Sequence, residues 1–374
     1  MSKKAIIAII VAAVVLVGGG VTAFFLLRPT EEKKEEAVVV DKHPNQAQSI
    51  LTGQWIDKNI QSQRPIAIMM ENEKHNHPLF GLNSSGVIYE CPVEGSSTRF
   101  MVIYDNNIDD NLKLGNVRSS RPYYIYFAHE FDALYVNWGA SVRAIDILAT
   151  DYIDNLSGVI NAKLDTVCFF KTNDHPSPSN IYTNRGMIMQ GVQQMNYRTT
   201  LDTNKPKKFT FTEEADQPNT LAVEGATDCM VIKPYFFVNL PRFEYDPATQ
   251  KYKRFQFGKE QIDGNDNSQI VCDNIIFQDV DSHDLEEHDT ANSPYIWCET
   301  TGKGTGKYFT KGKMIDITWS RPTENDVTKY YDMKGNEIVI NQGRTWVCTT
   351  ENKYKDKNQY YATIEEYNAA NTKK

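Results

Sequence analysis

An uncharged apolar run near the N-terminus is the sequence feature that most restricts the topology of this chain. Residues 5–27 contain no charged side chain, and a helix of that length crosses the ~30 Å hydrocarbon core of a bilayer. Lys3 and Lys4 precede the run. Because positive flanks stay in the cytoplasm, we expect residues 1–29 to form a single transmembrane anchor in the cell membrane, with the C-terminal part extracellular. A cleaved signal peptide is the alternative, with residues 21–23 as its cleavage site.

A polar segment follows the run and leads to the part of the chain that can fold. Residues 30–57 include the sequence EEKKEE and are predicted to be a solvated tether. Roughly 310 residues remain, which is enough for two domains of ordinary size. The formal net charge is −8 and no strongly basic block occurs. We therefore expect no nucleic-acid partner.

All six cysteines lie in the part that is predicted to be outside the cell. They are Cys91, Cys168, Cys229, Cys272, Cys298 and Cys348. No pair has the C-x-x-C spacing of a zinc ribbon or a thioredoxin-type site. Disulfides can form outside the cell, but several of these cysteines stand in strand-like runs, where a thiol packs as a small apolar side chain. The sequence leaves both readings open, and it predicts no metal site and no cofactor.

Between residues 58 and 207, strand-like and helix-like runs alternate. Strands are predicted over residues 64–72, 87–91 and 98–104. The first of these ends with Glu71 and Asn72. A helix is predicted to begin at Pro122, and residues 141–156 place apolar side chains on one helical face. Such alternation predicts a three-layer α/β domain.

The pattern changes after residue 207. Residues 208–352 contain strand-like runs joined by the hairpin sequences YDPATQKY and DMKGNE, which predict a mostly antiparallel β domain. The glycine-rich segment 301–313 departs from the phosphate-binding loop pattern, so we interpret it as an exposed turn. Residues 283–289, HDLEEHD, are predicted to be a flexible acidic loop rather than a metal site. The tail, residues 353–374, is polar.

Three arginines in the predicted α/β domain are candidates for a binding site. Arg99 stands at the start of a strand, and Arg118 and Arg121 flank Ser119 in the loop before a helix. Guanidinium groups bind phosphate or carboxylate through two parallel hydrogen bonds. The internal carboxylates that can pair with them instead are Glu90, Glu94 and Asp132. The sequence does not decide between an anion site and a set of internal ion pairs.

A proline-rich loop holds the remaining candidates. His175, Asn180 and Tyr182 lie in or just after this loop, which follows a predicted strand, a common position for functional side chains in α/β domains. The alternative is a structural loop whose polar groups bond its own backbone. The predicted ligand-binding residues are Arg99, Arg118, Ser119, Arg121, Glu90, Asp132, His175, Asn180 and Tyr182.

Several segments resemble the YerB-like family of bacterial cell-surface proteins. RPIAIMMEN, EGSSTRFMVIY and GNVRSSRPYYIYFAHEF resemble its N-terminal domain, and TGKGTGKYFTKGKMIDITWSRP and KYYDMKGNEIVINQGRTWV resemble its C-terminal domain. The resemblance implies an envelope protein, mostly of Gram-positive bacteria, whose domains carry no assigned function. Many members look like lipoproteins, but this chain lacks the lipobox cysteine, which leaves a helical anchor.

Three functions remain open at this point. The first is binding of an anionic wall glycopolymer, a lipid-linked precursor or a wall-synthesis protein. The second is a phosphotransferase acting on lipid-linked glycopolymer, in which the arginines hold a pyrophosphate and Glu71, Glu90 or Asp132 places a metal or a base. The third is a scaffold without a ligand. Because no recognised nucleophile or metal motif occurs, the sequence favours binding.

Overall fold

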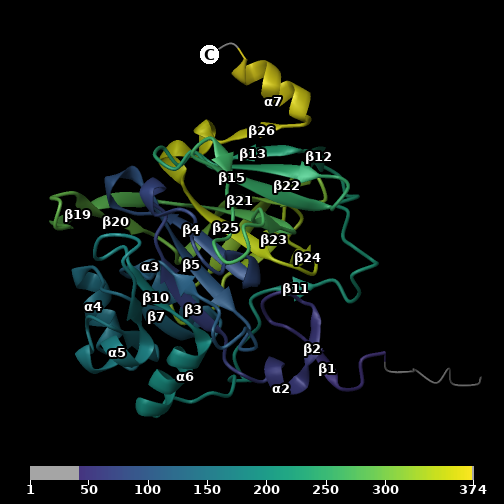
Figure 1. Ribbon diagram of the computed structural model, residues 1–374. Helices are drawn as coiled ribbons and strands as arrows, with labels where there is room; N and C mark the ends of the chain where they lie inside the picture. Colours follow the sequence, from purple (N-terminus) through teal and green to yellow (C-terminus); the bar gives the residue numbers. More distant parts are fainter. Residues whose placement is uncertain (1–41, 373–374) are drawn as a thin grey trace, which may run out of the picture. The chain divides into compact units, whose positions relative to one another are not determined.

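One large mixed sheet runs through the chain from Asn45 onward, which forms a compact unit (Figure 1). The computed structural model describes residues 42–372. The sheet has eleven strands in the order β12-β22-β21-β18-β25-β4-β5-β3-β7-β8, and β23 pairs with β22 off this path. The strands are β3 (Ile66–Met70), β4 (Val87–Pro92), β5 (Thr98–Tyr104), β7 (Leu134–Asn137), β8 (Asn155–Ser157), β12 (Thr227–Asp228), β18 (Asn274–Val280), β21 (Gly302–Thr310), β22 (Lys313–Arg321), β23 (Lys329–Asp332) and β25 (Thr345–Glu351).

Strand β25 joins the two halves of the chain within this sheet. It pairs in parallel with β18 on one side and with β4 on the other, and Thr345 lies opposite both Asn274 and Val87. Every residue of β3, β4, β5 and β18 is buried. Strands that are apolar and buried on both faces need a layer of structure on each side.

Helices cover one face of the sheet beside β4. Helix α3 (Pro122–Glu130) begins with proline, whose fixed φ suits the first helical turn. Its Phe127 ring stacks on Tyr89 of β4, with ring centroids 4.4 Å apart. Helix α4 (Val142–Leu148) lies in the same apolar cluster through Ala144 and Leu148. On the opposite face lie α5 (Asp165–Cys168) and α6 (Arg185–Gln194).

A second sheet packs against that opposite face over the C-terminal half. Its strands are β13 (Val231–Lys233), β14 (Arg242–Asp246), β15 (Lys251–Gln256), β16 (Lys259–Glu260), β17 (Val271–Cys272) and β26 (Gln359–Tyr361). Strand β15 alternates buried and half-buried residues, so one of its faces points inward. Phe243 and Tyr252 of this sheet share an apolar cluster with Phe277 and Trp346 of the large sheet.

The remaining elements are short. They are β1 (Gln46–Gln48), β2 (Trp55–Asp57), β6 (Leu114–Gly115), β9 (Phe170–Lys171), β10 (Ile181–Thr183), β11 (Thr210–Phe211), β19 (Ser282–His288), β20 (Pro294–Cys298), β24 (Val339–Ile340), α2 (Lys58–Gln61), α7 (Ile364–Asn371) and the 3-10 turns η1 (Lys74–Asn76), η2 (Leu82–Ser84), η3 (Glu94–Ser96), η4 (Ala162–Leu164) and η5 (Asn352–Lys357). The pair β1–β2 lies in residues that the sequence assigned to the tether.

The fold class expected from the sequence needs correction. The described chain is a mixed α/β protein with many strands, because β25 of the C-terminal half adds to β4 of the N-terminal half in one sheet. Within residues 42–372, no helix combines the length and the apolar character needed to cross a membrane. The predicted anchor, residues 1–29, and the start of the tether lie outside the described residues.

Three local predictions were also wrong. The segment 301–313 contains β21, a nine-residue strand, instead of an exposed turn. Residues 283–288 belong to β19 and pair with β20 instead of forming a flexible loop. Helix α4 ends at Leu148, not near residue 156, and its Val142 is exposed.

All six cysteines are buried with free thiols. The Sγ of Cys91 donates to the Thr349 hydroxyl at 3.2 Å, and burial raises the pKa of this thiol to about 12. A thiol with so high a pKa forms little thiolate at neutral pH. The cysteines therefore act as small apolar core residues in this structure.

Candidate binding cleft

A cleft of about 470 Å³ opens where β3 ends. One side is the segment 71–75, which follows β3, and the floor is the turn between β4 and β5 together with Thr98 and Arg99 at the start of β5. Arg118 enters from the loop before α3, and the turn of the β19–β20 hairpin closes the far side. Residues from both halves of the chain therefore build this cleft.

Arg118 and Glu71 form an incompletely bonded ion pair in the cleft. The backbone N–H of Arg118 donates to the carbonyl of Met69 at 3.0 Å, which brings its side chain beside the end of β3. Its Nη2 lies 3.4 Å from Oε1 of Glu71, and its Nη1 donates to the Ser179 hydroxyl at 3.3 Å. Within residues 42–372, the two carboxylate oxygens of Glu71 and the Nε of Arg118 have no hydrogen-bond partner.

Burial acts on both members of this pair. The side chain of Glu71 is 2% exposed and that of Arg118 is 15% exposed. Burial raises the pKa of Glu71, and the positive charge of Arg118 opposes that rise. Burial likewise lowers the pKa of Arg118, and Glu71 opposes that fall. Two charges have thus lost most of their water without gaining a full set of hydrogen bonds, which is unfavourable for both.

Arg121 differs from Arg118 because the protein itself supplies hydrogen-bond acceptors to its guanidinium group. Its Nε donates to Oε2 of Glu94 at 2.9 Å, and its Nη2 donates to the other oxygen of the same carboxylate. Its Nη1 donates to the carbonyl of Ser120 at 2.7 Å, and the guanidinium lies 4.9 Å from the ring centre of Tyr295. Arg121 therefore fixes the β4–β5 turn and does not line the cleft.

Arg99 lines the cleft and is partly paired. Its Nη1 donates to the carbonyl of Ser119 at 2.7 Å, and its Nη2 lies 3.9 Å from Oε1 of Glu94. The hydroxyl of Ser119 donates to the carbonyl of Trp138 at 3.1 Å. The structure thus brings Arg99 and Arg118 to one cleft and assigns Ser119 a supporting backbone contact.

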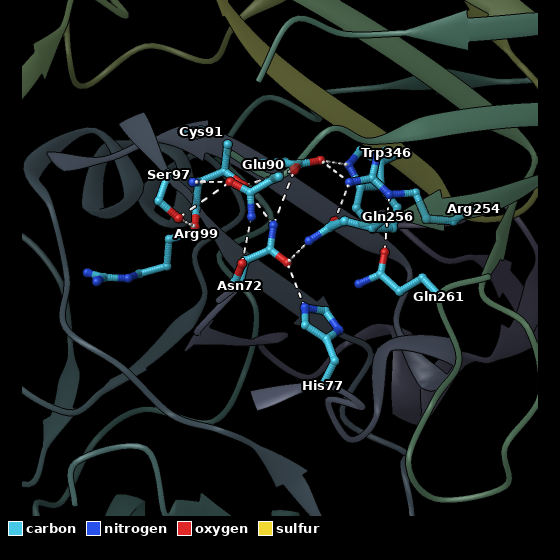
Figure 2. Close-up of polar contacts among 12 residues, drawn as sticks. Asn72, His77, Glu90, Cys91, Ser97, Arg99, Arg254, Gln256, Gln261 and Trp346 are labelled. Atoms are coloured by element: carbon cyan, nitrogen blue, oxygen red, sulfur yellow. Dashed lines mark hydrogen bonds and ion pairs between the residues drawn. The ribbon is translucent and has the colours of Figure 1, made fainter. Parts of the chain in front are cut away.

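Glu90 lies beneath the cleft in a buried polar network (Figure 2). Its Oε2 accepts hydrogen bonds from Nη2 of Arg254 at 2.7 Å and from the indole of Trp346 at 3.1 Å. Its Oε1 accepts from the Thr98 hydroxyl at 3.0 Å and from the Asn72 amide at 3.3 Å. Thr98 and Asn72 also line the cleft, so the network supports its floor.

Arg254 is the residue of this network that the sequence analysis missed. It is fully buried, and its guanidinium lies 4.5 Å from the ring centres of both Phe243 and Trp346. Its Nη2 also donates to Gln256, whose amide donates to Asn72 at 2.6 Å. In β15 the buried residues are Tyr252, Arg254 and Gln256. The sequence pointed the other way, because Phe255 and Phe257 alternate on the opposite face from Arg254.

The other predicted residues lie elsewhere. Asp132 accepts hydrogen bonds from Nη1 and Nη2 of Arg198 at 2.8 and 2.7 Å. The amide of Asn180 donates to the carbonyl of Thr172 at 2.9 Å, and the Tyr182 hydroxyl donates to Asp174 at 2.7 Å. Asp132, Asn180 and Tyr182 therefore hold neighbouring segments together, and none of them lines the cleft.

His175 is half-buried in the same loop as Asn180. No group of three or more His, Cys, Asp or Glu side chains in residues 42–372 is arranged to hold a metal ion.

Comparisons with known proteins place the chain in a family. Residues 51–198 match the family described as "Protein of unknown function (DUF3048) N-terminal domain", and residues 232–347 match its C-terminal domain. "Putative lipoprotein YerB" of Bacillus subtilis (strain 168) is 25% identical over 312 residues, which cover 82% of this chain and 88% of that protein. The crystal structure of YerB protein from Bacillus subtilis has a TM-score of 0.70 at 22% identity, over 84% of this chain and 99% of that one. The chain therefore belongs to the YerB-like family, as its sequence segments predicted.

Proposed function

We propose that this protein works in the cell envelope, outside the cytoplasm, and that its cleft binds a ligand through an anionic group held by Arg118 and Arg99. The name of the Bacillus subtilis relative, "Putative lipoprotein YerB", supports the location. The position of both arginines on the lining of one open cleft supports the site. A phosphate or carboxylate is the group that a guanidinium fork binds best.

One observation carries this proposal, namely the unused hydrogen-bonding groups of Arg118 and Glu71 at the cleft. Nearly all buried polar groups in folded proteins have a partner, so those without one need an explanation. Within residues 42–372, the Nε of Arg118 and both oxygens of Glu71 have none. A ligand in the cleft does not reach these three buried atoms, but it contacts the 15% of the Arg118 side chain that stays exposed there. An anionic group at that point offsets the loss of water that the weak pair with Glu71 leaves uncompensated.

The contrast with Arg121 supports a binding role for Arg118 over a scaffold role. A scaffold needs arginines whose bonds are already made, as those of Arg121 to Glu94 are. Arg118 makes one hydrogen bond of 3.3 Å from its side chain and one longer ion pair of 3.4 Å. The proposed ligand contact is therefore assigned to Arg118 and Arg99, with Arg121 holding the turn that forms the floor.

The test is titration of the full-length protein with glucose 1-phosphate by calorimetry. This probe carries one anion and several hydroxyl donors. Replacing Arg118 with Ala should weaken binding by about 2 kcal/mol, roughly 30-fold, because a charged hydrogen bond contributes on that order. The thermal unfolding midpoint should fall less than that of Arg121→Ala, since the pair of Arg118 with Glu71 is long and its guanidinium makes one hydrogen bond.

The matched control is Arg143→Ala, which removes an exposed arginine that pairs with Glu287 outside the cleft. Its affinity for the probe should equal that of the wild type. The proposal is wrong if Arg118→Ala binds the probe as tightly as the wild type does. It is also wrong if the wild type binds no probe and Arg118→Ala unfolds at a much lower temperature.

A further inference from the structure

A second cavity of about 400 Å³ adjoins the arginine cleft. The two cavities share Val93, Glu94, Gly95 and Ser97 of the β4–β5 turn, and Ser293 of the β19–β20 hairpin. A Cβ atom at Gly95 would meet no heavy atom within 4 Å, so the space beside this residue of the turn is open. The turn is therefore a common floor that leads from one cavity to the other.

The walls of the two cavities are continuous as well. In the segment after β13, Tyr235 and Phe237 line the second cavity and Val238 lines the arginine cleft. In the hairpin, Ile296 lines the second cavity and Ala291 lines the arginine cleft. The segment after β13 and the β19–β20 hairpin therefore each line both cavities, as the two sides of one groove do.

The lining of the second cavity combines aromatic rings with two lysines and three carboxylates, of which Lys353 and Glu351 pair with each other. Tyr235 and Tyr354 lie with ring centroids 5.5 Å apart, and Nζ of Lys357 is 4.8 Å from the centre of each ring. Lys357 makes no ion pair with any side chain between residues 42 and 372. Phe237 is 66% exposed at the same cavity. Tyr235 and Tyr354 are half-buried, and Nζ of Lys353 lies 5.3 Å from the centre of the Tyr354 ring. An exposed ring beside two half-buried rings and a cation suits a ligand that has both a flat face and a charge.

We infer that the two cavities form one groove that binds a chain-like ligand, an anionic glycan whose sugar rings lie on Tyr354 and Phe237 and whose charged groups meet Arg118 at one end and Lys357 at the other. This inference rests on the proposed function of the arginine cleft. Each cavity alone has the size of a small-ligand site, so the groove has room for more than one unit of such a chain. A chain that occupies both ends binds more tightly than one unit, because its second contact is intramolecular.

The experiment compares ligand length with two single substitutions in the full-length protein. The probes are glucose 1-phosphate and uronic acid oligomers of two, four and eight sugars, titrated by calorimetry. We expect the octamer to bind the wild type at least about tenfold more tightly than the dimer. Tyr354→Ala should remove this gain and leave the affinity for glucose 1-phosphate unchanged, whereas Arg118→Ala should weaken the binding of every probe.

Lys357→Ala should reduce the length gain in the same way, and Lys303→Ala is its control, because Lys303 is exposed and lines neither cavity. If glucose 1-phosphate binds through Arg118 but the oligomers bind no tighter with length, the groove inference is wrong and the proposed function stands. If the length gain survives in Tyr354→Ala and Lys357→Ala, the groove inference is wrong too. If no probe binds the wild type, both proposals fail.

Discussion

Breaking the buried pair of Arg254 and Glu90 should strongly destabilise the fold. Both side chains are fully buried, and Nη2 of Arg254 lies 2.7 Å from Oε2 of Glu90. Removing one member of such a pair costs about 3–5 kcal/mol, because the other charge stays buried. We expect Arg254→Ala to fall at the lower end, about 3 kcal/mol, since Glu90 keeps three neutral donors.

A double-mutant cycle tests this reasoning. Arg254→Met combined with Glu90→Gln removes both charges while keeping the approximate shapes, so the double variant should be more stable than Arg254→Met alone. The coupling energy should reach about 2 kcal/mol, within the range for contacting residues. Urea denaturation followed by tryptophan fluorescence measures it, because Trp346 contacts both residues of the pair.

The control is a cycle on the exposed pair Lys334 and Glu224, whose side chains are 68% and 86% exposed. Exposed pairs couple weakly, so this cycle should give a much smaller coupling energy. A coupling at Arg254 and Glu90 no larger than that of the exposed pair would refute the reasoning. So would an Arg254→Ala variant that loses less than about 1 kcal/mol.

Three further predictions concern stability. Burial lowers the pKa of His77 to about 4, and the positive charge of Arg254 adds to this effect. Between about pH 6.5 and 4 the unfolded chain therefore binds a proton that the folded chain does not, so the free energy of unfolding should fall by up to about 3 kcal/mol as the pH drops through that window. In urea titrations, the stability of His77→Gln should depend less steeply on pH. Arg121→Ala should lower the thermal unfolding midpoint well below that of Arg118→Ala, and equal midpoints would contradict its structural role. Gly306→Ala should destabilise the protein by about 2 kcal/mol or more, as for a clash in a packed sheet, because its Cβ would lie 2.0 Å from the carbonyl oxygen of Phe277. Lys303→Ala, at an exposed position of the same strand, is the control in the same denaturation assay.

Local patterns in the sequence were sufficient for several elements of the fold. Apolar spacing predicts the strand at residues 66–70, which ends before Glu71 and Asn72. The conformational limits of proline predict the helix that begins at Pro122. Both features place the cleft. The cleft itself needed the pairing of distant strands, which a single sequence does not reveal.

The glycines of β21 show why one prediction failed. Glycine is ordinarily a turn signal, and segment 301–313 has four of them. Gly304 lies under the Trp319 ring and Gly306 against the backbone of Phe277, so these positions lack a side chain because neighbours occupy the space. The two roles of glycine look the same in a sequence.

The roles of Arg118 and Arg121 could not be told apart from sequence either. Both stand in the same short loop, three residues apart. Their difference arises from Glu94, which the β4–β5 turn presents to Arg121 in two-oxygen contact, and from Glu71, which reaches Arg118 only at 3.4 Å. Such differences of a few tenths of an ångström depend on the assembled fold.

The place of β25 has a consequence for the order of synthesis. Strand β4 ends at residue 92, but the strand that completes its outer edge, β25, begins at residue 345. While a ribosome makes the chain, β4 keeps an edge with unpaired backbone groups until about 250 more residues have followed. Such an edge is a template for aggregation, and distant pairing of this kind is slow. A chain that stops short of residue 345 therefore retains that open edge permanently, so premature termination near the end should be as damaging to this protein as termination in the middle.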